Sequence, residues 1–374
     1  MSATSLAASA SPVRVTLGSR TVDRDNNIQL LRLLAACAVV VFHCFALTDR
    51  WTSEPLWRLA PELNLGALGV KVFFVISGFL VTQSWLSRPR IGPFVVARVL
   101  RIYPALVAAT LFTASLAALS APMSLARFLA DPQTRDFLAQ TSIAWAAPDQ
   151  LPGAYAHNPF ARAVNGSLWT LPIEVRLYVA LGIAGVLALL AHRVAWTIAL
   201  LALLGLGLIV PDAITLALHG GPGNRSVLEL ALLFAIGSAA YVWRDAIPVS
   251  LVALAACVIV VAWNPLGLGR GALFEPLLAY AVLTLAYHPT LLWNPFNRVG
   301  DYSYGVYVYS FPIQQTLVER LPGLGPYALL ALALPLALVL AALSWHLLEQ
   351  PALRLKSRLR TSGPSHHDQA PDPA

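Results

Sequence analysis

Arg32 and His43 are the residues whose types and spacing most directly suggest chemistry. Both lie in the apolar run QLLRLLAACAVVVFHCF, eleven positions apart. Eleven helical steps are close to three turns, so both side chains share one helix face, about 16 Å apart along its axis. Histidine titrates near neutral pH and often carries protons in active sites. The pair predicts a catalytic His43, with a packed structural pair as the alternative.

Arg98 and Arg101 form a second candidate pair in the segment RVLRIYP. Because they are three positions apart, they share one face of a helix. Two guanidinium groups so spaced can bind phosphate through charge-assisted hydrogen bonds. Arg32 has a similar predicted depth and could join them. The sequence predicts an anion clamp of Arg32, Arg98 and Arg101; arginines that only reach the membrane surface and set the topology are the alternative.

Glu174 is an acidic residue in an apolar segment that also contains Arg176 and Tyr178. A carboxylate inside a membrane is a candidate functional group by default. It could orient a histidine ring or accept a hydrogen bond from a substrate hydroxyl. The residues alone favour neither such a functional role nor a structural ion pair of Glu174 with Lys71 or Arg176.

A further set of polar residues is predicted to line a cavity rather than to face lipid. The segment GDYSYGVYVYSFPIQQ is unusually polar for a membrane span, and Ser77-Gly78 would let another helix or a ligand approach closely. Glu229 and Glu275 lie nearer to segment ends and are interpreted as structural. The predicted acceptor or cavity residues are Lys71, Ser77, Trp169, Arg176, Tyr178, Tyr304, Tyr307 and Ser310.

Composition excludes several other classes of function. The net charge is +7, but no cluster of basic residues alternates with aromatic residues on a polar face, so nucleic acid is not an expected partner. Cys37, Cys44 and Cys257 lie inside apolar runs and are interpreted as small packing residues. No metal site is predicted.

The elements that must position these residues are membrane helices. Hydrophobic residues make up 57% of the chain and charged residues only 11%, whereas soluble domains have about 25% charged residues. A membrane-crossing helix needs about 20 mainly apolar residues. The predicted fold class is therefore all-α, a polytopic membrane protein of about ten transmembrane helices. The predicted segments are 28–47, 65–86, 94–119, 168–190, 194–211, 226–243, 246–263, 272–289, 301–319 and 326–348.

The basic residues predict the orientation, because lysine and arginine are enriched in cytoplasmic loops. With the N-terminus inside, most of the 25 lysines and arginines fall on the cytoplasmic side, so both termini are predicted to be cytoplasmic. The expected location is the cell inner membrane. The predicted organisation is a cytoplasmic N-terminal segment at 1–24, a ten-helix domain at 25–356 with an external loop at 120–167, and a disordered cytoplasmic tail at 357–374.

The external loop at 120–167 is long enough to form a recognition lid. It contains Trp145, Tyr155, His157 and Phe160. These side chains could stack on sugar rings, or they could lie among the lipid headgroups as an interfacial belt. The belt is the preferred interpretation.

Together, these motifs resemble the acyltransferase-3 family of integral membrane O-acyltransferases. Any one of the motifs is weak evidence, but they occur in the family's order over residues 25–356. The matching motifs are Arg32 to His43 (arginine, ten residues, histidine), the pair Arg98 and Arg101, FFVISGFL (73–80), SLWTLPIE (167–174), SYGVY (303–307) and Glu349-Gln350-Pro351. The chain departs from the pattern at Ser310, where the family often has a histidine before its proline. No extracellular hydrolase-like domain is expected after the last helix.

The resemblance implies an enzyme that moves an acyl group from cytoplasmic acyl-CoA, with no other cofactor, to a hydroxyl of an envelope or exported polysaccharide. Arg32, Arg98 and Arg101 would hold the CoA phosphates. His43 would act as general base, and Glu174 would orient His43 or the acceptor. Alternatives are a flippase or transporter of lipid-linked glycan, an acyltransferase acting on a small secreted metabolite, and a non-catalytic assembly protein. Membrane lipid is an expected partner, and the oligomeric state is not indicated by the sequence.

Overall fold

The computed structural model describes residues 15–21, 25–59, 64–218, 225–263, 270–293 and 299–361. Within these ranges the protein is helical and has no β-strand, apart from isolated bridges. The all-α prediction is therefore confirmed. Most of the predicted N-terminal segment and of the predicted tail lies outside the described residues.

Ten helices coincide with the ten apolar segments predicted from the sequence. They are α2 (Ile28–Leu47), α4 (Leu65–Leu86), α5 (Ile91–Ser120), α8 (Thr170–Val186), α9 (Arg193–Ile209), α11 (Arg225–Val242), α12 (Leu251–Trp263), α13 (Arg270–Tyr287), α14 (Ser303–Arg320) and α15 (Pro326–Ser344). The shorter elements are α1 (Leu17–Arg20), η1 (Trp51–Ser53), α3 (Pro55–Leu59), α6 (Leu125–Ala130), α7 (Pro132–Ser142), η2 (Leu189–Ala191), α10 (Pro211–Ala217), η3 (Pro289–Leu291), η5 (Trp345–Glu349) and α16 (Gln350–Thr361).

Four helices are long and apolar enough to cross a membrane, judged by length and composition. They are α2, α4, α5 and the continuous helix Pro326–Leu355. The exposed faces of α9 and α12 also carry large apolar side chains, among them Ile209 at 79% exposure and Val252 at 81%. Wide apolar surface of this kind suits lipid better than water. The chain is therefore a membrane protein.

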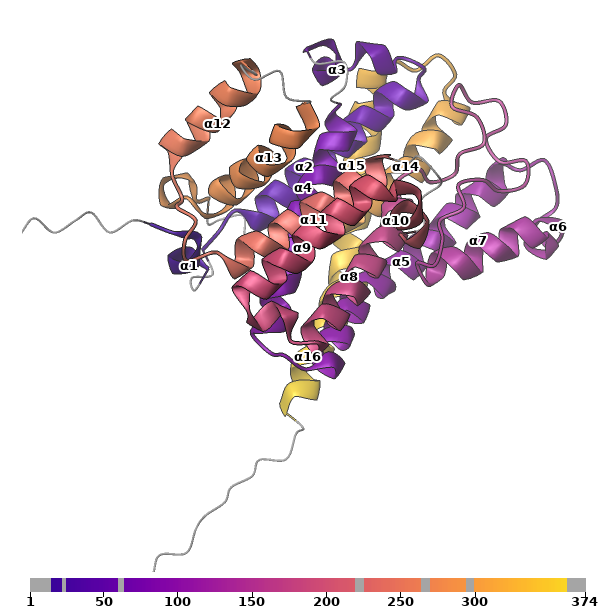
Figure 1. Ribbon diagram of the computed structural model, residues 1–374. Coiled ribbons are helices and arrows are strands. Elements are labelled where there is room, and N and C mark those ends of the chain that lie inside the picture. Colours follow the sequence, from indigo (N-terminus) through magenta and orange to yellow (C-terminus); the bar gives the residue numbers. More distant parts are fainter. Residues whose placement is uncertain are drawn as a thin grey trace, which may run out of the picture.

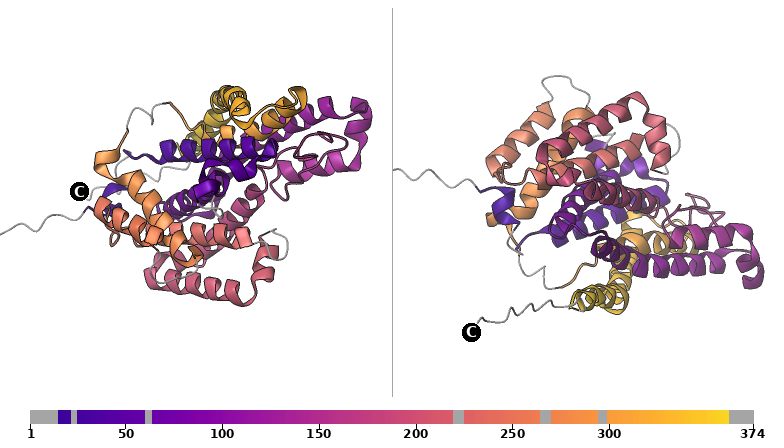
Figure 2. Two further views of the ribbon diagram at one scale, coloured as in Figure 1. Left: turned by 90° about the horizontal axis from the view of Figure 1, so that it is seen from above. Right: turned by 60° about the horizontal axis from the view of Figure 1, so that its bottom comes forward.

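Helices α2 and α4 lie at the centre of the helix packing. In spatial order, α15 packs on α14, α14 on α2, α2 on α4, and α4 on α11. The views in Figure 2 place the indigo α2 and α4 between the yellow α14 and α15 and the salmon-coloured helices that follow α8. Arg32 and His43 lie on α2 and Ser77 on α4, so the predicted site residues lie at the centre of the protein.

The crossing of α4 and α11 depends on two glycines. A Cβ atom at Gly78 would lie 2.0 Å from the backbone oxygen of Phe234, and one at Gly237 would lie 2.2 Å from the backbone oxygen of Val75. Each glycine therefore lets the other helix approach to backbone contact. This confirms the close approach predicted at Ser77-Gly78 and fixes the helix that carries Ser77.

The segment predicted as an external loop contains α6 and α7, which pack beside the end of α5 and project from one side of the molecule (Figure 1). The interpretation of its aromatic residues is wrong for Tyr155. This side chain is fully buried in a small second core, and its hydroxyl lies 2.9 Å from Thr316 Oγ1. Burial raises the pKa of Tyr155 to about 12. Trp145 and Phe160 are exposed.

Pro351 lies inside the last long helix and does not end it. The chain remains helical from α15 through the π-helical turn η5 into α16. In an α-helix, the ring of a proline clashes with the carbonyl four residues earlier, and its nitrogen cannot donate a hydrogen bond. The wider π turn directly before Pro351 changes the position of those carbonyls, so the proline is accommodated.

Candidate active site

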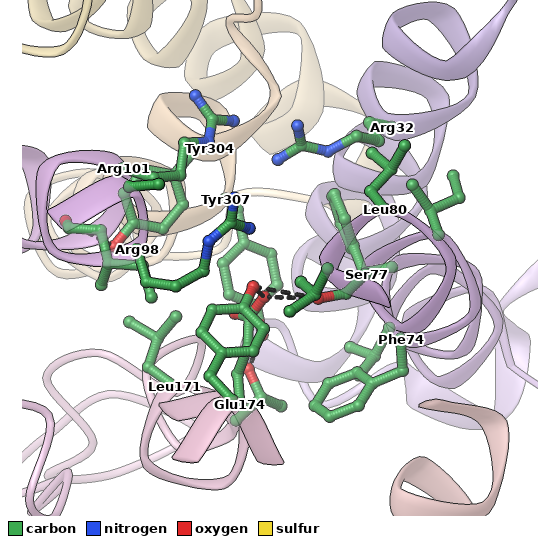
Figure 3. Close-up of a pocket in the computed structure, with 18 of the residues that line it drawn as sticks. Arg32, Phe74, Ser77, Leu80, Arg98, Arg101, Leu171, Glu174, Tyr304 and Tyr307 are labelled. Carbon is green, nitrogen blue, oxygen red and sulfur yellow. Dashed lines mark hydrogen bonds between the residues drawn. The ribbon is translucent and has the colours of Figure 1, made fainter. Parts of the chain in front are cut away.

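A cavity of about 240 Å³ lies between α2, α4, α5, α8 and α14; we call it the arginine cavity. Its polar lining contains Arg32, Ser77, Arg98, Arg101, Thr170, Glu174, Tyr178, Tyr304 and Tyr307, and the rest is mainly apolar. Figure 3 shows three guanidinium groups that approach this space from two helices, with Glu174 and Ser77 on the opposite side. The clamp predicted from residues far apart in the sequence is therefore brought together around one space.

Two of these arginines share one carboxylate, that of Asp301. Its Oδ2 accepts from Arg32 Nη1 and, at 2.6 Å, from Arg101 Nη2. Ser303 donates to the other oxygen through its hydroxyl and, at 3.3 Å, through its backbone N–H. Asp301 itself is buried. A buried carboxylate with four donors is well compensated, so it holds two guanidinium groups at fixed positions.

Arg101 has a second acidic neighbour, Glu349, at 3.4 Å. Glu349 is fully buried and also accepts a hydrogen bond from Ser344 at 3.1 Å. Glu349 belongs to the π-helical turn η5, and this turn places its carboxyl group next to Arg101. Functional side chains are frequent in such turns.

Arg98 differs from the other two arginines. It has no ion-pair partner in the part of the chain that the structure describes, and its buried Nε has no hydrogen-bond partner there. Its guanidinium group lies 5.6 Å from the centre of the Tyr178 ring, and Nη2 is 3.4 Å from Ser84 Oγ. Arg98 therefore keeps most of its donors available for an anionic ligand.

Glu174 is part of a small hydrogen-bonded group on the other side of the arginine cavity. Its Oε1 accepts from Tyr178 and, at 3.1 Å, from Ser77. The hydroxyls of Ser77 and Tyr178 lie 2.9 Å apart. Residues 174 and 178 are one turn apart on α8, so the helix itself aligns them.

A second cavity, of about 210 Å³, contains His43, and we call it the histidine cavity. Its polar lining includes His43, Asn64, Lys71, Ser167, Trp169, Ser226, Glu229 and Tyr307. The His43 ring packs edge-on against Phe311 at 4.9 Å between ring centres. His43 is 8% exposed, and its Nδ1 has no hydrogen-bond partner among the described residues. A ring held by packing, next to an open space, can accept a proton from a bound molecule.

Lys71 lies in the histidine cavity between two carboxylates. Its ammonium group pairs with buried Glu275 and, at 3.1 Å, with the half-exposed Glu229. The structural interpretation of Glu275 agrees with this position. Glu229 also lines the cavity beside His43, which the sequence did not indicate.

The comparison with known families decides the class of protein. A family model described as an acyltransferase domain matches residues 25–346. The chain belongs to this acyltransferase family. The protein is accordingly an acyltransferase enzyme, and the resemblance inferred from the motifs is confirmed.

Two curated relatives cover nearly the whole acyltransferase. The O-acetyl transferase of Shigella phage Sf6 is 29% identical in an alignment 348 residues long that covers 89% of this chain and 98% of the relative. Nodulation protein 10 of Rhizobium leguminosarum bv. viciae is 29% identical in an alignment 370 residues long that covers 89% of this chain and 95% of the relative. No solved structure matches this chain.

Three predicted site residues of the acyltransferase have other surroundings than expected. Arg176 lines neither cavity, because it donates to the backbone oxygens of Pro172 and Trp145, at 3.0 Å each, on the outward side of α8. Ser310 is fully buried and lines neither cavity. Glu174 pairs with neither Lys71 nor Arg176 in the described structure, and it lines the arginine cavity rather than that of His43.

Asp301 is the site residue that sequence reasoning missed. It precedes α14 by two positions and was included only as part of a polar segment. One signal was present: Asp301 is the first residue of the predicted span 301–319, and an acidic residue there, in a chain with two separate arginine motifs, needs a basic partner. The sequence could not indicate which arginines would supply it.

Proposed function

We propose that the protein is a membrane O-acyltransferase that moves an acyl group from acyl-CoA to a hydroxyl of an envelope or exported polysaccharide, with His43 as general base. The observation that carries this proposal is the adjacency of two cavities with different chemistry. One contains three arginines, and the other contains a histidine whose buried Nδ1 has no hydrogen-bond partner among the described residues; Val70 and Tyr307 line both. The name of the phage relative, an O-acetyl transferase, supports a hydroxyl as acceptor and acetyl as the acyl group.

The lining of the arginine cavity suits the binding of the donor, acyl-CoA. CoA carries several phosphate oxygens, and Arg98 has donors available for them, whereas Arg32 and Arg101 are paired with Asp301. We propose that Arg98 makes the first phosphate contact and that Arg32 and Arg101 add positive charge around it. The apolar remainder of the lining suits the pantetheine arm. Glu174, with Ser77 and Tyr178, would offer polar contacts to the amides of that arm.

The acceptor hydroxyl would bind in the histidine cavity. His43 takes the proton as the hydroxyl oxygen attacks the thioester carbonyl carbon, and the new C–O bond forms as the C–S bond breaks. The thiolate of CoA leaves and takes a proton, directly or by way of His43, so no other reactant is needed. Lys71 also lines this cavity, where its ammonium group is paired with Glu229 and Glu275, and it would donate a hydrogen bond to the oxyanion.

The membrane arrangement that fits this chemistry has about ten crossing helices and both termini in the cytoplasm. On α2, Arg32 lies near the N-terminal end and His43 near the C-terminal end. In this orientation the arginine cavity faces cytoplasmic acyl-CoA, and the histidine cavity faces the outside of the inner membrane. The excess of basic residues on the predicted inner side supports it.

The test uses membrane vesicles that contain the protein, acyl-labelled CoA and a crude envelope-glycan fraction. Label should enter the glycan with the wild type and not with His43→Ala, while both proteins fold equally well. His192 is exposed and lines neither cavity, so His192→Ala serves as the matched control. Normal transfer by His43→Ala would contradict the assignment of the base. No transfer by the wild type, with any donor or acceptor in a broad panel, would contradict the proposed reaction.

A further inference from the structure

The two cavities follow each other along the same helices. On α2, Arg32 lines the arginine cavity and His43 the histidine cavity. On α4, which runs the opposite way, Lys71 lines the histidine cavity and Ser77 the arginine cavity. The order is therefore the same on both helices, so the boundary between the cavities crosses them at one level.

The boundary between the two cavities can also be located at the start of α8 and on α14. Trp169, directly before α8, lines the histidine cavity, whereas Thr170, its first residue, lines the arginine cavity. On α14, Tyr304 lines the arginine cavity, and Tyr307, one turn later, lines both. Four helices thus agree on where one cavity ends and the other begins.

Only Val70 and Tyr307 appear in the lining of both cavities among the described residues. Both are nearly buried, at 8% and 6% exposure. The Tyr307 hydroxyl lies 2.8 Å from Thr170 Oγ1, and its ring meets that of Phe73 edge-on at 5.7 Å. We define these two side chains as the partition.

The backbone around the partition has little room to move. Every residue of α14 from Ser303 to Gln315 is buried. A Cβ atom at Gly305 would lie 2.6 Å from the Cα of Ala341, so α14 and α15 are in backbone contact there. The width of the partition is therefore set by the Val70 and Tyr307 side chains, and it changes by rotation of these side chains rather than by movement of helices.

We propose that Val70 and Tyr307 determine the length of the acyl group that the enzyme transfers, and that they restrict it to short groups such as acetyl. This proposal rests on the proposed function, in which a thioester bound in the arginine cavity must reach His43 in the next one. An acetyl group passes the partition with the least displacement of the two side chains. Each added methylene must displace them further, and one methylene in a tight apolar site changes specificity by about 10- to 200-fold.

The experiment compares acetyl-, propionyl-, butyryl- and octanoyl-CoA as donors in the vesicle assay. Wild type should prefer acetyl, with a steep fall along the series. Val70→Ala removes two methyl groups from the partition and should raise the ratio of butyryl to acetyl transfer about tenfold or more. Val70→Ile adds a methylene and should lower the propionyl-to-acetyl ratio by a similar factor.

Two further variants separate size from other effects. Val75 is a fully buried residue of the same helix that lines neither cavity, so Val75→Ala removes the same atoms elsewhere and should keep the wild-type ratio. Tyr307→Phe keeps the ring but loses the contact with Thr170; it should change the rate for all donors together. A shifted ratio in Val70→Ala and an unshifted ratio in Val75→Ala would support the proposal.

The proposal would be overturned if wild type used all four donors equally, or if Val70→Ala transferred acetyl normally with an unchanged ratio. Either result leaves the proposed function intact, because transfer itself is observed. Absence of transfer by the wild type from every donor would instead overturn the proposed function, and the length proposal with it.

Discussion

In the arginine cavity, Arg32 and Arg101 are compensated by Asp301 and Glu349, and Asp301 is compensated in turn by Ser303. In the histidine cavity, His43 Nδ1 and Ser167 Oγ are buried and have no hydrogen-bond partner among the described residues. A buried polar atom without a partner costs about 1–3 kcal/mol. The ion pairs thus hold Arg32 and Arg101 in place before any ligand arrives, whereas Arg98 in the same cavity and the polar atoms around His43 keep unused hydrogen-bonding capacity. The ion pairs should therefore matter most for stability, and His43 for the reaction rate.

The largest effect expected in the histidine cavity is on the reaction rate. His43→Ala should lower kcat about 10²- to 10⁴-fold, because a general base contributes that much. The apparent KM for acyl-CoA should change little, since the donor binds in the other cavity. Steady-state kinetics in vesicles measure both constants. A large rise in KM with unchanged kcat would mean that His43 binds donor rather than moving a proton.

The largest effect expected in the arginine cavity is on stability. Asp301→Asn should destabilise the protein by about 3–5 kcal/mol, because it leaves two buried guanidinium groups without their shared carboxylate. Thermal unfolding in detergent would measure the loss. As a control, Asp245→Asn removes the exposed partner of Arg193 and should cost at most about 1 kcal/mol. Equal losses in the two variants would contradict the structural role of Asp301.

Arg98 offers a sharper test within the arginine cavity. Arg98→Gln should raise the KM for acyl-CoA about 10- to 100-fold, since a charge-assisted hydrogen bond is worth about 1.5–3 kcal/mol. Little stability should be lost, because no carboxylate among the described residues pairs with Arg98. Arg101→Gln should instead lose stability, because the buried carboxyl groups of Asp301 and Glu349 would both lose a cationic partner. Measurement of KM and melting temperature for both variants separates the two roles. A stable Arg101→Gln would remove the distinction.

The smallest expected effects come from replacing a serine with alanine at Ser303 and, for comparison, at Ser167. Ser303→Ala removes a hydrogen bond to a buried carboxylate and should cost about 1.5–3 kcal/mol. Ser167→Ala removes a hydroxyl that has no partner in the described structure, so its effect on stability should lie within about 0.5 kcal/mol of zero. Unfolding of the two variants under the same conditions gives the comparison directly. A large loss in Ser167→Ala would mean that its hydroxyl has a partner in solution.

The helices could be predicted from the sequence because each follows from a local run of apolar residues. The same holds for Arg32 and His43, whose common face follows from helical periodicity alone. Arg98 and Arg101 were also found in this way. These residues are predictable because the information lies within a few turns of one helix.

The contacts between helices could not be predicted in this way. Asp301 meets Arg101 across 200 positions of sequence, and Arg176 turns outward because Trp145 lies beside it. The burial of Tyr155 depends on how α6 and α7 fold back on α5. Each of these outcomes is decided by tertiary packing, which a periodicity does not encode.

The π-helical turn η5 has a consequence for the angular position of the residues around it. In an uninterrupted α-helix, eight steps from Ala341 would turn Glu349 about 80° away from the buried face. Each residue of a π turn rotates by a smaller angle about the helix axis than a residue of an α-helix. Over the length of η5 the difference adds up to roughly a quarter of a revolution, which brings Glu349 almost in line with Ala341. A helical wheel of constant pitch therefore misplaces Glu349. The charge balance of Arg101 depends on a local change of winding 248 positions further along the chain.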